Sequence, residues 1–316
     1  MAFMTPRSSA TGPLISLVPK GTAPLPRALM FLSVIIILAM LAVILIDVMI
    51  GGLGTISWEF LSSPPSQGME AGGIFPAIFG TMLLVILMVI AVVPIGVLTA
   101  VYLQEYTNPQ SRLTRVLRAA INNLAGIPSI VFGLFGLGFF VGFIGGGLDR
   151  LFHPDSGPVW GQPAIIWASL TMALLTLPVV IVSTEEALRA IPRELKEASY
   201  ALGATKLQTI IRIVIPQALP GIFTGAILAV SRGAGEVAPI MFTGAAYYLS
   251  HLPSSLHDQF MVLGYHVYVL ATQSPNIDAT LPLLYGTVLV LLVLTFALNL
   301  VAILIRARIR SRRISA

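Results

Sequence analysis

The sequence predicts an all-α polytopic membrane protein with six transmembrane helices. Of its 316 residues, 56% are hydrophobic and only 10% are charged, whereas a soluble domain carries about 25% charged residues. The mean hydropathy is +0.92. Six apolar runs are close to the ~20 residues that a helix needs to cross the hydrocarbon core of a bilayer. Polar or glycine- and proline-rich segments separate these runs, so a bundle of membrane helices is the expected fold.

The chain begins with a segment rich in Pro, Ser, Thr and Gly, which is typical of a flexible tail. The apolar run that follows is too long for a signal peptide. The predicted spans are residues 28–50, 74–103, 119–144, 163–182, 221–246 and 281–305. The expected parts are an N-terminal tail (1–27), a first helix with an outer loop (28–73), a five-helix transmembrane domain (74–305) and a basic tail (306–316). In the outer segment before the last span, the aromatic and apolar stretch 260–270 suits a helix lying at the membrane interface.

The basic residues predict how the chain is oriented. Six spans place both termini on one side, and sixteen of the 18 Lys and Arg residues fall in the tails and loops of that side. Arg150 falls on the other side and Arg232 lies inside a span. By the positive-inside rule, both termini and the loop 183–220 are expected in the cytoplasm of a bacterial cell, with the chain in its plasma (inner) membrane and in contact with lipid. This explains the net charge of +5 without nucleic acid as a partner.

The loop 183–220 is the longest charge-bearing stretch between two apolar runs. Ser183 and Glu186 have the spacing of a capping box, which predicts that a helix starts there. Pro192 breaks that helix and suits the first turn of a second one, over 193–202.

Two further residues of the same loop are expected to end helices. Gly203 suits the left-handed position that ends a helix, because it has no Cβ. A third helical run, 206–215, is expected to stop before Pro216.

A spaced pattern runs through this loop. Its members are Glu197, Ala198, Ser199, Gly203, Ile213, Ile215 and Pro216. The pattern resembles the EAA loop of ABC importer permeases, with Ser199 in place of the second Ala and Ile215 in place of Leu. The resemblance implies a type I (MetI-like) permease fold and a cytoplasmic loop that docks into a cleft of an ATPase subunit. The alternative is an ordinary amphipathic helix pair at the interface.

Arg232 and Glu236 are two charges inside the predicted fifth span. A charge at the middle of the membrane costs about 2.5–3.5 kcal/mol on insertion scales, so its presence needs a reason. At positions i and i+4 both side chains would project from one helical face. Arg232 could attract an oxyanion on a translocation path while Glu236 holds it when the path is empty. The alternative is a structural ion pair.

The sequence shows no motif for catalysis, nucleotide binding or metal binding. There is no Cys, no phosphate-binding G-x-x-x-x-G-K-[ST] loop, and the four His are scattered without acidic partners at ligand spacing. We therefore expect no enzyme activity, no metal and no cofactor. The run 125–136, AGIPSIVFGLFG, either breaks the third span where it lines a cavity or serves tight small-residue packing.

Three segments resemble a narrower family. They are Gly126–Gly133 (GIPSIVFG), Arg232–Pro239 (RGAGEVAP) and Tyr268–Asn276 (YVLATQSPN). Together with the EAA loop they are similar to phosphate-specific ABC importer permeases of the PstA type, in which Thr often stands in place of Val237. The resemblance implies phosphate as substrate, a sister permease of the PstC type, two copies of a PstB-type ATPase and an extracytoplasmic PstS-type binding protein. It also implies that Arg232 and Glu236 lie near the translocation route.

The sequence is also compatible with three alternative functions. One is a permease for another oxyanion, such as sulfate or molybdate. Another is an ion-coupled secondary transporter, which would need membrane-embedded titratable groups that are sparse here. A third is a scaffold for another membrane assembly. Only the ABC hypotheses require a stoichiometric ATPase.

Overall fold

The computed structural model describes residues 24–155 and 157–314. The chain forms two compact units, residues 1–47 and 48–316. Helix α1 (Pro24–Leu53) makes up the described part of the first unit, and its last turns belong to the second. The large apolar side chains of the first unit from Leu29 onward are exposed, as expected for a helix that faces lipid. Most of the predicted tail 1–27 lies outside the described residues.

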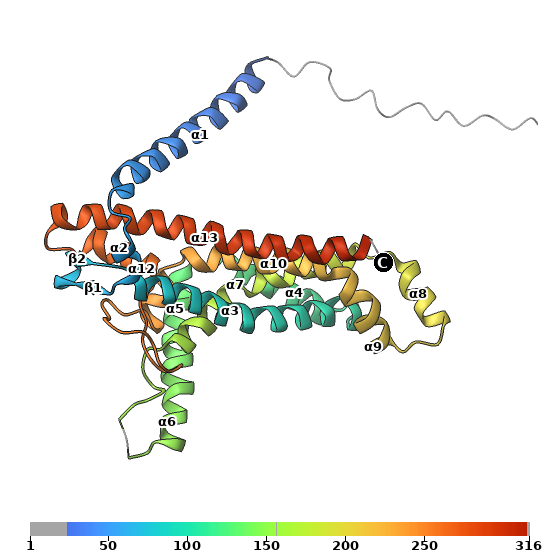
Figure 1. Ribbon diagram of the computed structural model, residues 1–316. Coiled ribbons are helices and arrows are strands. Elements are labelled where there is room, and N and C mark those ends of the chain that lie inside the picture. Colours follow the sequence, from blue (N-terminus) through green and yellow to red (C-terminus); the bar gives the residue numbers. More distant parts are fainter. Residues whose placement is uncertain (1–23, 156, 315–316) are drawn as a thin grey trace, which may run out of the picture. The chain divides into compact units, whose positions relative to one another are not determined.

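The second unit is a bundle of long helices (Figure 1). Its elements are α2 (Trp58–Ser62), β1 (Pro65–Ser66), η2 (Gln67–Met69), β2 (Ala71–Gly72), α3 (Phe75–Val101), η3 (Tyr102–Tyr106), α4 (Arg112–Leu124), α5 (Ser129–Phe135), η4 (Gly136–Gly145), α6 (Gly146–Phe152), α7 (Ile165–Arg189), α8 (Arg193–Ala201), α9 (Lys206–Thr209), η5 (Ile210–Val214), α10 (Ile215–Gly235), α11 (Ala238–Thr243), α12 (Leu263–Thr272) and α13 (Ile277–Ile314). Within the described residues, six helices are long and apolar enough to cross a membrane: Ala28–Leu53, Phe75–Tyr106, Ser129–Phe152, Ile165–Arg189, Lys206–Gly235 and Ile277–Arg308. The six predicted spans are thus confirmed in number. In the part of the chain that the structure describes, β-structure is limited to the antiparallel pairing of β1 with β2, two residues each, and an isolated parallel bridge between Ala245 and Phe260.

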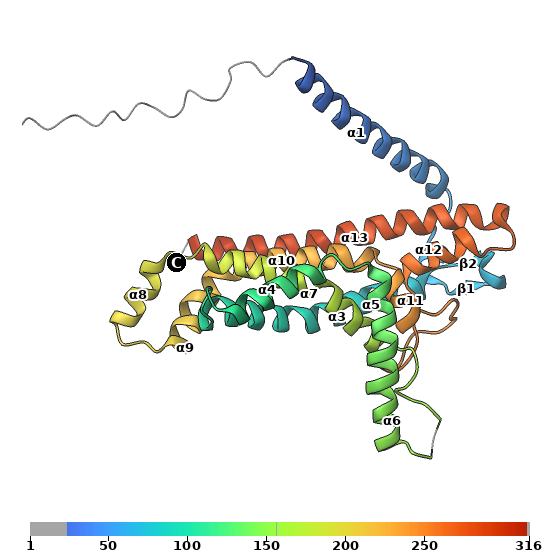
Figure 2. The same cartoon turned by 180° about the vertical axis from the view of Figure 1, so that it is seen from behind.

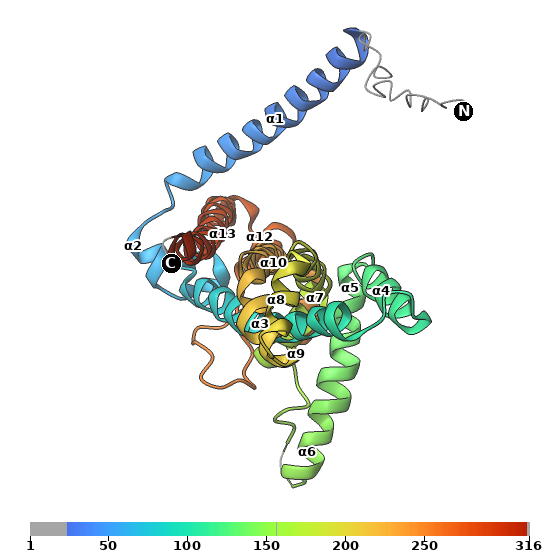
Figure 3. The same cartoon turned by 90° about the vertical axis from the view of Figure 1, so that its right-hand side faces the viewer.

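Helices α3, α7 and α10 form the centre of the bundle, as the end-on view shows (Figure 3). Small residues bring them together. A Cβ on Gly96 of α3 would lie 2.7 Å from Val180 of α7, and one on Gly221 of α10 would lie 2.2 Å from Ala187 of α7. Close backbone approach at small residues is the usual means of packing helices in membranes, where lipid is as apolar as the side chains.

Helix α13 covers α10 along much of its length (Figures 1 and 2). Two side-chain hydrogen bonds join the pair. Ser231 Oγ donates to Asn299 Oδ1 at 2.7 Å, and Arg306 Nη1 donates to Thr224 Oγ1 at 2.9 Å. The bundle has two distinct ends: α8 and α9 lie at one, while α2, β1, β2 and α12 lie at the other.

The third span is placed differently from the prediction, which put it at residues 119–144. Helix α4 is separate, and the membrane-length helix starts at Ser129 and continues to Phe152. Pro128 explains the break, because a proline disfavours helical backbone in the residue before it. The glycines Gly145–Gly147 were expected to start a loop but continue the helix, since glycine is tolerated in membrane helices.

The predicted helix start at Ser183 is wrong. Helix α7 runs without interruption from Ile165 to Arg189, so the helix of the fourth span extends beyond residue 182. Ser183 instead serves packing: a Cβ on Gly225 of α10 would lie only 3.0 Å from the Ser183 Cβ. A capping box requires non-helical backbone at its first residue, and the contact with α10 holds Ser183 inside the helix.

The predicted stop before Pro216 is also wrong, because one helix continues from Lys206 to Gly235. A π-helical turn, η5, precedes the proline, and Ile215 N–H donates to the carbonyl of Ile210, five residues back. The wider turn accommodates a residue that lacks an N–H and crowds the preceding turn.

Segment 260–270 was expected to form an interfacial helix, but its residues pack into the protein. Phe260 and Leu263 are fully buried, and α12 begins only at Leu263 and packs against α13. The apolar face therefore finds its partners within the bundle rather than at a membrane surface.

Candidate functional site

The turn between α8 and α9 projects from one end of the bundle (Figure 1). Pro192 lies just before α8 with extended backbone, and Ala201 ends the helix. Gly203 has φ +81°, the left-handed conformation that the sequence predicted for it. Most side chains are strained at this φ, so the backbone conformation itself favours glycine at this position.

The chain then enters α9 through a capping box that sequence reasoning missed. Thr205 Oγ1 accepts a hydrogen bond from Gln208 N–H, and Gln208 Oε1 accepts one from Thr205 N–H at 2.8 Å. The spacing Thr-x-x-Gln is the signature of this motif and was present in the sequence.

The first three residues of the EAA pattern have different environments. Glu197 and Ala198 are exposed, whereas Ser199 is buried and its Oγ lies 2.9 Å from Thr209 Oγ1. The N–H of Ala204 also donates to the Ser199 carbonyl at 3.2 Å. Ser199 therefore ties α8 to α9 across the turn, which accounts for the hydroxyl in place of a methyl group.

Beside this tie lies an open groove of about 520 Å³. It is lined by Leu195, Ala198, Ser199, Leu202, Gly203, Ala204, Gln208, Arg212 and Ile213. Leu202 at the tip is 90% exposed. Leu195 in the same groove is 41% exposed, and adjoining exposed apolar side chains of this kind are typical of a protein-binding surface.

The last members of the pattern lie further inside. Ile213 is in η5 and half-buried, while Ile215 packs against a buried apolar cluster that includes Leu188 and Val214. Pro216 follows η5 near the start of α10. The structure therefore brings Glu197, Ala198 and Gly203 to the surface of the turn, places Ile213 in the lining of the groove and packs Ile215 into the bundle.

A polar cavity lies behind this region and was not foreseen from the sequence. It has a volume of about 190 Å³, and its polar lining comes from α4 and α7: Arg118, Asn122, Glu185, Glu186 and Arg189. Glu185 is buried and lies 3.3 Å from both Arg118 Nη2 and Arg189 Nη2. No local motif marks Glu185, because one of its partners is 67 positions earlier in the chain.

Arg232 and Glu236 do not share one helical face as predicted, because α10 ends at Gly235. Glu236 has extended backbone with ψ 137°. Pro239 explains the end, since it has no N–H to donate to the Gly235 carbonyl. An ion pair nevertheless forms, with Arg232 Nε 3.4 Å from Glu236 Oε1, and the side chains are 37% and 22% exposed.

The broken backbone after Arg232 is covered by α5 and α12. A Cβ on Gly133 of α5 would lie 3.0 Å from the Ala238 carbonyl oxygen, and one on Gly264 of α12 would lie 3.1 Å from Val237. Irregular backbone at membrane depth is tolerated where protein covers it. The small residues of the run 125–136 therefore include at least one position that serves close packing.

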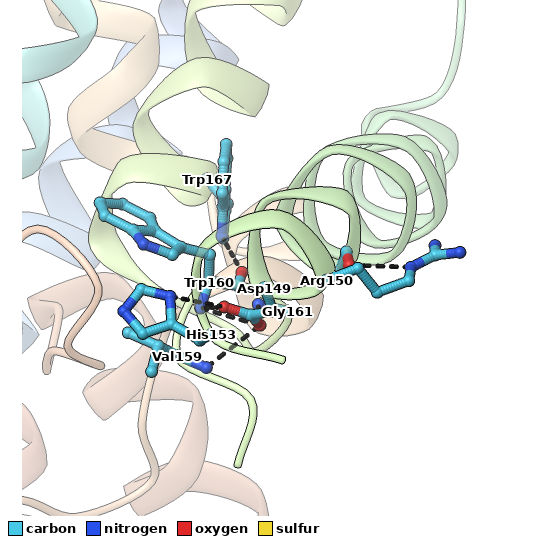
Figure 4. A network of polar contacts seen from close by, with 8 residues as sticks. Asp149, Arg150, His153, Val159, Trp160, Gly161 and Trp167 are labelled. Atoms are coloured by element: carbon cyan, nitrogen blue, oxygen red, sulfur yellow. Dashed lines mark hydrogen bonds and ion pairs between the residues drawn. The ribbon is translucent and has the colours of Figure 1, made fainter. Parts of the chain in front are cut away.

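One carboxylate of α6 organises the loop that follows this helix (Figure 4). Asp149 accepts hydrogen bonds from the N–H groups of Val159, Trp160 and Gly161 at 2.6–3.1 Å. The indole of Trp167 in α7 donates to the Trp160 carbonyl at 2.7 Å. These bonds hold the loop to two helices and form a structural feature of this end of the chain.

Six membrane-length helices, a central core of three of them and a protruding helical turn define a class, the ABC importer permease fold. A solved bacterial ABC transporter involved in the import of the acidic polysaccharide alginate is similar, with a TM-score of 0.66 over 90% of this chain and 95% of that chain. The sequence identity is 16%, so this similarity shows the fold alone.

Sequence similarity establishes the family of this chain. Residues 92–315 match the family of binding-protein-dependent transport system inner membrane components, and the chain belongs to that family. It is a multi-pass membrane transport component. The probable ABC transporter permease protein YqgI of Bacillus subtilis is 35% identical over 71% of this chain and 71% of its own. The phosphate transport system permease protein PstA 1 of Mycobacterium tuberculosis H37Rv is 35% identical over 77% of this chain and 72% of its own.

Proposed function

We propose that this chain is the PstA-type permease subunit of an ATP-driven importer of inorganic phosphate. The observation that carries the proposal is the turn of α8 and α9. Its left-handed Gly203, exposed Glu197 and Ala198, and largely exposed Leu202 form a protruding surface suited to a separate ATPase. Similarity to PstA-named proteins supports phosphate as the substrate.

In this proposal the complex contains a PstC-type sister permease, a dimer of PstB-type ATPases and a PstS-type binding protein. ATP-driven closure of the ATPase dimer moves the α8–α9 turn and switches the membrane helices between outward and inward access. Arg232 attracts the oxyanion, and Glu236 holds the guanidinium when no anion is bound. The domain that does this is residues 74–305, and both termini and the turn lie in the cytoplasm.

The decisive experiment is phosphate uptake by the complex reconstituted in proteoliposomes, with and without this subunit. We expect ATP-dependent uptake only with it, and competition by excess phosphate but not by sulfate or molybdate. Competition by sulfate or molybdate alone would assign another oxyanion, and uptake without any ATPase would indicate an ion-coupled transporter.

The role of Arg232 is tested by Arg232→Gln. We expect lower phosphate transport with the ATPase still bound, whereas Arg150→Gln in α6 is a matched control with normal transport. Transport kinetics unchanged by Arg232→Gln would favour a structural ion pair.

Orientation is tested by single cysteines, because the chain has none of its own. A cysteine at exposed Leu202 should react with a membrane-impermeant maleimide only from the cytoplasmic side, and one at Asp155 only from the outer side. Labelling of position 202 from outside would overturn the proposed orientation.

A further inference from the structure

The π-helical end of α3, η3, is contacted by a cation from each of four other elements. Its four successive residues Leu103 to Tyr106 are the partners. Arg118 of α4 donates to the Leu103 carbonyl at 3.2 Å, Arg189 of α7 donates to Gln104 Oε1 at 3.4 Å, Lys196 Nζ of α8 contacts Glu105 Oε1, and Lys206 Nζ of α9 lies 4.7 Å from the Tyr106 ring centre. We call this set the η3 junction.

Among the four contacts of the η3 junction, the one between Lys196 and Glu105 is an ion pair. Their side chains are 18% and 8% exposed, whereas that of Arg189 is 51% exposed. Exposed ion pairs contribute little, but a buried charge that loses its partner is strongly unfavourable. The pair is therefore the tie at this junction that resists separation.

The pair joins the protruding turn directly to the centre of the bundle. The backbone of α8 lies beside α9 and η5, and its Ser199 binds Thr209 within the same turn. Lys196 instead reaches across to the end of α3, which is packed against α7 and α10 along the bundle. The two residues are 91 positions apart, so the tie links segments that the chain does not connect locally.

We propose that Lys196 and Glu105 are positioning residues that carry the displacement of α8 into α3. The inference rests on the proposed function, in which an ATPase moves the α8–α9 turn. When α8 moves, the ion pair moves η3 with it, and the π-helical turn is where α3 changes its hydrogen-bonding pattern. Such turns inside α-helices often mark functional positions. Glu197, the next residue after Lys196, is then free to face the ATPase.

Charge reversal tests the tie in the full complex. Lys196→Glu or Glu105→Lys should lower ATP-dependent phosphate uptake about tenfold, within the roughly 5–150-fold range for coupling between sites, while the complex still hydrolyses ATP. The double reversal Lys196→Glu with Glu105→Lys should restore uptake to within about threefold of the starting protein, because the pair is rebuilt with opposite polarity. Single reversals with normal uptake, or a double reversal no better than either single, would overturn the proposal.

A matched control is Arg112→Glu, which reverses an exposed charge at the start of α4 for which the described residues show no ion pair. It should leave uptake unchanged. If a single reversal does not assemble, the double variant Lys196→Met with Glu105→Met leaves no unpaired charge. It should assemble and hydrolyse ATP yet import phosphate poorly, and normal import would again overturn the proposal. Failure of the unmodified complex to import phosphate with ATP would count against the proposed function instead.

Discussion

Gly203 allows the backbone conformation of the α8–α9 turn to be tested separately from the docking role proposed for this turn. Its φ of +81° is left-handed, and a Cβ placed there would meet no atom within 4 Å. The cost of a side chain within this chain is therefore backbone strain alone, about 1–2 kcal/mol for an L-residue such as Ala. That corresponds to a loss of roughly 5–30-fold in the population of the turn. Asn costs less than Ala, because its short polar side chain is tolerated in this conformation.

These strain energies predict how strongly three substitutions of Gly203 should reduce ATP-dependent uptake by the reconstituted complex. Gly203→Asn should be mildest in ATP-dependent uptake, and Gly203→Ala should lose up to the fold-change given by strain. We expect Gly203→Asp to abolish uptake. Because Asp and Asn have nearly the same shape, a larger loss with Asp than with Asn would come from burying a carboxylate against the ATPase. We expect all three proteins in the membrane at normal amounts, because the turn is exposed.

Two results would refute this reasoning. Normal uptake and normal ATPase affinity in Gly203→Asp would show that no partner closes over the turn. Wild-type behaviour of Gly203→Ala would show that coupling does not need the left-handed conformation. Binding of the ATPase to the permease in nanodiscs gives the affinity for each variant.

Other predictions concern the interior. Gly80→Ala places a Cβ 2.1 Å from a backbone carbonyl oxygen ahead of α12, so it should lower stability by about 1–3 kcal/mol in a thermal unfolding assay, whereas Gly235→Ala, with nothing within 4 Å, should not. Ser199→Ala should cost about 1 kcal/mol through its lost bond to Thr209; adding Thr209→Val should cost less than a second independent loss, and full additivity would argue against the bond. Burial lowers the pKa of His266 to about 4, while an unfolded histidine protonates near pH 6.5. Stability should therefore fall as the pH drops from 6.5 toward 4, and His266→Gln should weaken that dependence.

The sequence alone was sufficient to predict those structural features whose physical cause is local. Hydropathy predicted the number of spans, because each helix satisfies its own backbone and needs only a sufficient apolar length. Gly203 was predicted to be left-handed, because the preference belongs to that residue. The EAA pattern was sufficient to predict the permease fold that the comparisons confirm.

The tertiary structure decided the local conformation where two local preferences compete, and it decided the contacts between residues that are distant in sequence. Ser183 could cap a helix or continue one, and its contact with Gly225 decided the outcome. Glu236 fits a helical i, i+4 pair by spacing, yet the chain turns to extended backbone there and the ion pair forms all the same. The tie between Glu105 and Lys196 joins residues 91 positions apart. No local pattern predicts such a pair, because it exists only once the fold has brought the Lys196 side chain of α8 within reach of η3.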